Sequence, residues 1–352
     1  TPTGLAEAIG LSAGPGAAVG VSEAEVILTP QVTSAAGGSG IINADSLLVE
    51  SRTNLYEHPD TPRKSAKAEA IGSAGALIGT TSTHANVQAG GSVTSEILPM
   101  SNLTVRETTV SADSFATNEA IADSYAGGAL AIGVSKAIAK STMEVGAEVG
   151  DGTHVDGGTL SIYSQRVHDQ LSDTLAGAGG LGIAGASASA ETSQSGDVTA
   201  ILGNQTTIVL TDVFQQSSTA DTTLNGSVVS YAGGILSGGG AYIDNNHQSH
   251  VSSTVGEDAQ ITASSIEIGA GNVFRKPEVD DNILGATGGL VSGASATSST
   301  ILDMTTDVVI KTNASLDVVG SESNEDLLIL RALNTIDAHD TVTFATGGAI
   351  SG

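Results

Sequence analysis

The sequence predicts an all-β protein, a parallel β-solenoid of about six repeats of 50–60 residues with four strand-like stretches in each repeat. Three features predict this class: a glycine-pair signature that recurs along the chain, apolar residues that alternate with polar ones, and only 3% aromatic residues. A repeat that cannot bury its apolar face alone buries it on its neighbours. We therefore expect residues 1–352 to form one continuous domain, shaped as a rod.

The glycine-pair signature occurs seven times with small variations, for example as Gly-Gly-Leu-Gly-Ile-Ala-Gly at 179–185. In the later repeats its second glycine recurs at nearly even spacing, as Gly128, Gly180, Gly234, Gly289 and Gly348. Glycines of this kind suit corners with positive φ, or places where another strand passes close by. The even spacing predicts that the signatures align along one side of the rod.

Four stretches follow one another in a fixed order within a repeat. In one repeat they are 227–232, 238–243, 249–256 and 259–268. Each alternates with period two, as a half-buried strand does, and none sustains the i, i+3, i+4 pattern of a long helix. Equivalent stretches are expected to stack about 4.8 Å apart in parallel sheets. The residues leave open the handedness and whether a repeat makes one broad coil or two narrow ones.

The last stretch of the repeats carries the apolar residues that we expect in the core. Because they alternate with polar neighbours, one set of side chains points inward and stacks on its equivalents in neighbouring repeats. The expected inward residues are Leu160, Ile162, Ile208, Leu210, Ile266 and Ile268.

The composition excludes several classes of partner. Thirty-eight acidic and 12 basic residues give a net charge of -26, whereas nucleic acid requires a cationic face. No apolar run approaches the roughly 18 residues of a membrane helix, so we expect no membrane insertion of this segment. Without cysteine, neither disulfides nor thiolate metal sites hold the fold. A last signature at 347–352 predicts that the chain continues into further repeats or stacks end to end.

The sequence Gly-Gly-Leu-Gly-Ile-Ala-Gly-Ala-Ser-Ala-Ser-Ala at 179–190 is followed by Val-Thr-Ala-Ile-Leu-Gly at 198–203. This repeat pattern, which covers nearly the whole chain, resembles the repeat region of large bacterial filamentous adhesins of the leukotoxin type. Those are giant secreted proteins with parallel β-solenoid shafts. The resemblance implies the same fold and a place outside the bacterial cell or on its surface.

We therefore expect a non-enzymatic, extracellular structural protein, the shaft of a bacterial surface adhesin or filament. Its expected partners are further copies, along the axis or laterally, and glycans or other cell-surface components. One alternative is a filament or sheath subunit that stacks end to end. A second is a carbohydrate-active β-helix enzyme, which needs clustered carboxylates and commonly aromatic sugar platforms. Nine aromatic residues and no tryptophan disfavour it.

The candidate metal ligands are carboxylates in two loops. The segment 151–158 has the Gly- and Asp-rich character of calcium-binding repeats, in which oxygen ligands bind a hard cation. Such sites rely on tandem copies, whereas this segment occurs once, so an ordinary turn is favoured over a site. We expect no cofactor, and calcium is the only ion that these residues suggest. The candidate ligands are Asp151, Asp156, Asp280 and Asp281.

Basic residues recur after the last strand of several repeats. If those positions stack, they form a cationic edge on an otherwise negative rod, suited to acidic glycans or to the acidic face of a second rod. The alternative, which we favour, is that each base neutralises nearby carboxylates. The residues of this candidate edge are Arg52, Arg63, Lys64, Arg106, Arg166, Arg275, Lys276 and Arg331.

Overall fold

The computed structural model describes residues 3–54, 65–277, 283–319 and 327–351. These residues form β-strands and short connections, and no helix occurs among them. The strands belong to one 20-stranded sheet, and every pairing in it is parallel. The prediction of an all-β, parallel fold is therefore confirmed.

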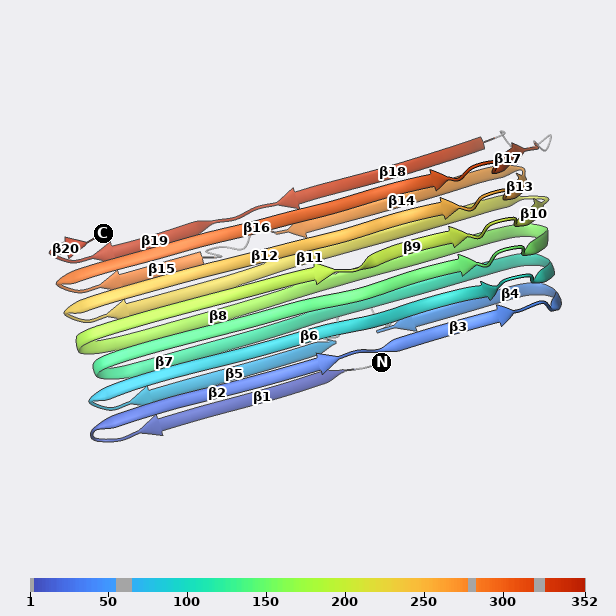
Figure 1. The fold of residues 1–352 in the computed structure, drawn as a ribbon. Helices are drawn as coiled ribbons and strands as arrows, with labels where there is room; N and C mark the ends of the chain where they lie inside the picture. Colours follow the sequence, from blue (N-terminus) through green and yellow to red (C-terminus); the bar gives the residue numbers. More distant parts are fainter. Residues whose placement is uncertain (1–2, 55–64, 278–282, 320–326, 352) are drawn as a thin grey trace.

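The chain runs back and forth between two edges, as Figure 1 shows. In the first half of the chain the strands are β1 (Gly4–Ala13), β2 (Ala17–Leu28), β3 (Gln31–Gly37), β4 (Ile41–Thr53), β5 (Ala66–Gly75), β6 (Ile78–Leu98), β7 (Asn102–Val149), β8 (His154–Ser195), β9 (Asp197–Leu202) and β10 (Thr207–Leu210). In the second half they are β11 (Val213–Gly233), β12 (Leu236–Val255), β13 (Gln260–Ala263), β14 (Ser265–Lys276), β15 (Ile283–Gly288), β16 (Val291–Ile310), β17 (Ser315–Val318), β18 (Leu327–Ala338), β19 (Val342–Gly347) and β20 (Ile350–Ser351).

Each segment pairs with the segment one repeat further along the chain. Ala66 of β5 pairs with Asn118 of β7, which pairs with Gln170 of β8, in two steps of equal length. The step from Gly4 to Ala66 is longer. Between two successive glycine turns the chain therefore runs a strand away from the glycine edge, a short strand at the opposite corner and a strand back. The sequence leaves open whether a repeat makes one broad coil or two narrow ones, because both arrangements have the same alternation of apolar and polar residues.

The six residues expected in the core are buried, as predicted. They do not all belong to one column, however. Leu160 pairs with Phe214, and Phe214 with Ile266, whereas Ile208 pairs with Val155 and Ile261 in the short corner strands. The corner strand and the long strand that follows it have the same alternation of apolar and polar residues. The sequence analysis therefore treated two columns of stacked residues, one in each kind of strand, as a single column.

The described part of the chain is a flat slab rather than a rod. The strands β11 and β12, one on each side of the glycine turn, have 21 and 20 residues. At about 3.3 Å per residue such a strand is roughly 70 Å long. The seven levels at the glycine edge, spaced about 4.8 Å apart, extend only about 30 Å. Figure 1 shows this wide, shallow stack, whose long axis follows the strands.

The space between the two long sides changes in width and chemistry. Near the corner strands it holds a large apolar cluster that includes Ile97, Leu160, Phe214 and Ile266. Toward the glycine edge the two buried clusters consist mostly of alanine. There the sides lie close together: a Cβ on Gly133 would meet the carbonyl oxygen of Gly177 at 2.7 Å. Small residues are needed there because the opposite backbone occupies the room of a side chain.

Candidate functional site

The glycine signatures align along one edge of the stack, as predicted. Backbone hydrogen bonds join successive turns, from Gly14 N to Gly75 O at 3.1 Å and from Gly289 N to Gly347 O at 2.9 Å. Residues that follow the glycines are paired in one column, Ala17–Ile78–Leu130–Ile183–Leu236–Val291–Ile350. In Figure 1 these turns lie at the left, away from the corner strands.

Aliphatic side chains project from this edge. Four residues at the tips of the turns are exposed by 55–84%: Leu77, Leu181, Ile235 and Leu290. Beside them, Ile183 is 51% and Leu236 46% exposed. We call these six residues the turn ridge.

The basic residues of the expected edge lie in separate environments. Arg52 forms ion pairs with Glu50 at 2.5 Å and Asp113 at 2.9 Å. Arg106 pairs with Asp45 at 2.8 Å, and Arg275 pairs with Asp221.

Two further members of that set, Arg166 and Lys276, are buried in the interior and do not contribute to a surface edge. Arg331 lines a hollow beside Glu267. Arg63 and Lys64 lie outside the described residues. Most of the basic residues that the structure describes therefore follow the alternative we favoured, with carboxylates as partners.

The candidate calcium ligands are not assembled in the described residues, where no group of three metal-ligating side chains occurs. Asp151 lies in the turn between β7 and β8, and its Oδ1 accepts hydrogen bonds from the backbone N (2.6 Å) and Nδ2 (3.2 Å) of Asn204 one repeat further on. The Oδ1 of Asn204 in turn accepts a bond from Glu257 N at 2.9 Å. This carboxylate therefore links stacked turns. Asp156 lies at the start of β8, and Asp280 and Asp281 lie outside the described residues.

A network of buried polar side chains crosses the interior between the alanine-rich end and the large apolar cluster. His168 lies at its centre, fully buried. Thr53 donates to Ser114 at 3.0 Å, and the Ser114 hydroxyl is hydrogen-bonded to His168 Nε2 at 2.9 Å. The Nδ1–H of His168 then donates to Gln194 Oε1 at 3.1 Å. Burial, followed by the charge of Arg166, lowers the pKa of His168 to about 3, so the imidazole is neutral at pH 7.

Arg166 lies next to this network and reaches across to a kink in the opposite side. The kink is at Gly196, between β8 and β9, where φ is +115°. The guanidinium donates to the carbonyl oxygens of Gly196 at 2.6 Å and Met143 at 3.2 Å, and to Ser249 Oγ at 2.8 Å. These bonds satisfy carbonyl groups at the kink. Burial lowers the pKa of Arg166 to about 10, so the group stays charged at neutral pH.

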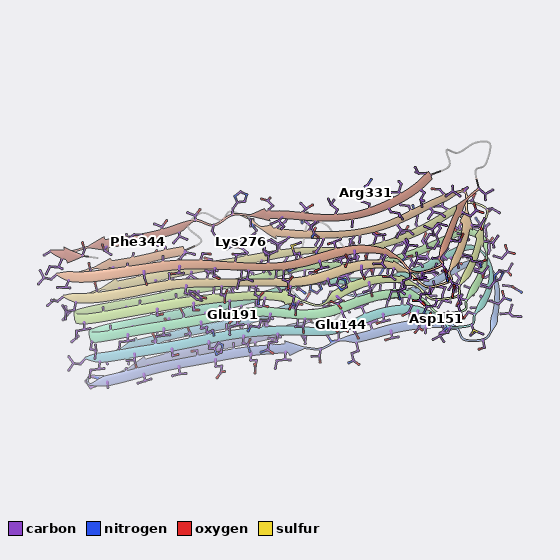
Figure 2. All side chains as sticks on the ribbon, turned by 45° about the horizontal axis from the view of Figure 1, so that its top comes forward. Glu144, Asp151, Glu191, Lys276, Arg331 and Phe344 are labelled. Atoms are coloured by element: carbon purple, nitrogen blue, oxygen red, sulfur yellow. The ribbon has the colours of Figure 1, made fainter. Side chains whose placement is uncertain are left out.

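The same interior continues toward the C-terminal levels. His247 is buried, with its ring 5.2 Å from that of Phe274. Burial, followed by the charge of Arg166, lowers the pKa of His247 to about 3. Lys276 donates to Thr300 Oγ1 at 3.0 Å and pairs with the carboxylate of Asp340. Figure 2 labels this lysine within the stack of strands.

The sequence analysis missed this polar interior, although the signal was present. Arg166, His168 and Gln170 have the same parity along β8 as the buried Leu160 and Ile162. Lys276 likewise continues the inward parity of Ile266. Alternation alone therefore predicts that Arg166 and Lys276 point inward. We instead placed both residues on the surface because they are charged.

An open groove lies on the outer face of the strands β4, β7, β8 and β11, with a volume of about 450 Å³. Its wall includes Glu50, Arg52, Asp113 and Tyr163. Glu50 and Asp113 both form ion pairs with Arg52. The Tyr163 hydroxyl donates to Gln215. The groove is polar, and its charges are compensated locally.

Comparison of the chain with models of protein families, with curated proteins and with solved structures found no match. Among the described residues, no helix has the length and apolar character needed to cross a membrane.

Proposed function

We propose that this chain is a structural element, a parallel β-solenoid of about six repeats that serves as a shaft in an extracellular adhesin or filament of a bacterium. The observation that carries the proposal is the register. Each circuit pairs in parallel with the next through long ladders, such as the one that runs from Leu236↔Val291 to Val255↔Ile310. In such a stack, stability and length both increase with each added repeat.

The interior supports the same role. Backbone ladders and stacked small residues define its shape, and polar side chains bond from one level to the next, as Asn118 does with Gln170 at 3.0 Å. Each level therefore holds its neighbours in one register. A wide stack of this kind suits a load-bearing or spacing role, in which surface and length carry the function.

The surface suits exposure to solvent and to partners. A net charge of -26 keeps such a stack soluble and opposes indiscriminate association. Within the proposal, the partners are further copies of the chain, along the axis or laterally, and glycans that bind to the outer faces.

Labelling of intact bacteria tests the location. Antibodies raised against the purified chain should bind unpermeabilised cells of the source organism, with the label on or beyond the cell envelope in electron micrographs. An antibody against a cytosolic protein serves as the control and should bind only after permeabilisation. Labelling that also requires permeabilisation would contradict the extracellular role.

A further inference from the structure

The turn ridge is an apolar stripe on a strongly acidic molecule, and Ala129 and Leu130, which are partly exposed, fill the level between Leu77 and Leu181. Its tip residues stack from one repeat to the next: Leu77 O accepts the N–H of Ala129 at 2.8 Å, and Ile235 O accepts that of Val291 at 3.0 Å. Single exposed aliphatic residues are common on protein surfaces, whereas a contiguous apolar stripe marks an interaction site.

The ridge also contains no charged residue. No Asp, Glu, Lys or Arg occurs at 8–22, 70–83, 124–135, 174–190, 222–243, 282–302 or 341–352, and each of these seven segments of the sequence contains one of the turns. All the charged residues of the chain, 38 acidic and 12 basic, lie elsewhere. Two copies that meet on another face bring like charges together, whereas two ridges meet without this repulsion.

We propose that the turn ridge is a lateral docking surface for the turn ridge of a second copy of this chain. The two surfaces are then the same patch on each copy, as in a two-fold dimer. The inference rests on the register of the turns and on the charge distribution, and it deepens the lateral self-association of the proposed function by naming its surface; a chain that dimerises through the ridge but is not found outside the cell would contradict only the proposed cellular role.

The size of the ridge sets the strength of this contact. From Leu77 to Leu290 the ridge crosses five levels, about 20 Å, and at a width of about 12 Å it buries on the order of 250 Å² on each copy, about 500 Å² in total. This lies below the range of stable complexes, so we expect a dissociation constant of roughly micromolar or weaker. The contact strengthens with each repeat that extends the ridge.

Leu181 gives a direct probe, because it lies on the fourth of seven levels and faces its own counterpart whether the two stacks run parallel or antiparallel. The natural chain has no cysteine, so a single Leu181→Cys variant carries a unique thiol. Under mild oxidation at concentrations where dimers form, this variant should yield disulfide-linked dimers. Leu48→Cys, on β4 and also exposed, is the matched control and should yield none beyond random collision. Equal yields from both variants would overturn the proposal.

Sedimentation velocity over a wide range of concentrations gives the second measurement. The triple variant Leu181→Glu, Ile235→Glu, Leu290→Glu should weaken dimerisation at least tenfold. The control Leu48→Glu, Val209→Glu, Ile301→Glu adds the same charge at exposed positions off the ridge and should dimerise as the natural chain does. Circular dichroism should show both variants folded.

Three results would overturn the proposal. The first is a natural chain that stays monomeric at every concentration. The second is undiminished association of the ridge variant, which would indicate end-to-end stacking. The third is binding of the monomeric natural chain to neutral phosphatidylcholine vesicles, lost in the ridge variant, which would assign the ridge to a lipid surface.

Discussion

Single buried residues hold the two sides of this stack together where its core is polar. Arg166 donates to carbonyl groups at the Gly196 kink, and His168 connects Ser114 to Gln194. Removing one partner from such a network leaves a buried polar group unpaired, which costs about 1–3 kcal/mol. The network therefore fixes which residue of one side faces which residue of the other.

The buried histidines make stability depend on pH. The pKa of His168 and of His247 is about 3 in the fold, against about 6.5 in the unfolded chain. Because the folded pKa is the lower one, the histidines do not reduce the free energy of unfolding above pH 6.5. That free energy decreases as the pH falls from about 6.5 toward 3, because the unfolded chain binds the protons more tightly. At pH 5 the loss is about 2 kcal/mol per histidine.

Denaturant unfolding at pH 7 and pH 5 measures this loss. Burial also raises the pKa of Asp123 and Asp173, which opposes the effect of the histidines on acidification, so variants must be compared. Between the two pH values, His168→Gln should lose less stability than the natural chain does, by about 2 kcal/mol. His339→Gln, at an exposed site, should behave as the natural chain does. An unchanged pH dependence in His168→Gln would show that this histidine is not buried and neutral.

Among the elements, the long return strands bend at a glycine. Gly196 separates β8 from β9, and a Cβ there would lie 2.3 Å from Met143 O. Gly91 pairs with Met143 one level away and has a φ of +133°. The backbone thus bends at the same place in neighbouring levels. The bend provides the carbonyl groups that Arg166 binds.

Replacing Gly196 tests the kink. Gly196→Ala should reduce the free energy of unfolding by about 1–3 kcal/mol, because a side chain at positive φ is strained and its Cβ meets a backbone oxygen. Gly238→Ala is the matched control, since a Cβ there meets no atom within 4 Å. Thermal or denaturant unfolding of the two variants measures the difference. Equal stability of both would mean that the backbone at residue 196 does not adopt the positive φ.

For the whole molecule, the proposed repeat architecture predicts a shape whose longest dimension follows the strands. Deleting the segment 118–169 removes one circuit and brings Gln170 into the register of Asn118 opposite Ala66. The shortened chain should fold, because each level contacts only its neighbours. Small-angle scattering should give the same maximum dimension for both chains and a smaller volume for the shorter one. A maximum dimension that falls in proportion to chain length would contradict the slab.

Local patterns in the sequence predict the strands, their parallel order, the aligned glycine edge and the parity of the core. The stretches expected at 227–232 and 238–243 lie within β11 and β12, and Ile266 is buried. These features are local: alternation decides which side of a strand is buried, and recurrent glycines mark where the chain turns back.

Which residues share a level follows from the folded stack and not from local sequence patterns. The step between equivalent residues is longer from Gly4 to Ala66 than from Ala66 to Asn118, and a shift of one residue reverses the face of every side chain that follows. Arg52, Arg106 and Arg166 follow similar strands in the sequence, yet two pair with carboxylates at the surface and one lies at the centre of the stack. Position in the stack depends on the summed length of corner strands and connections, which local alternation does not encode.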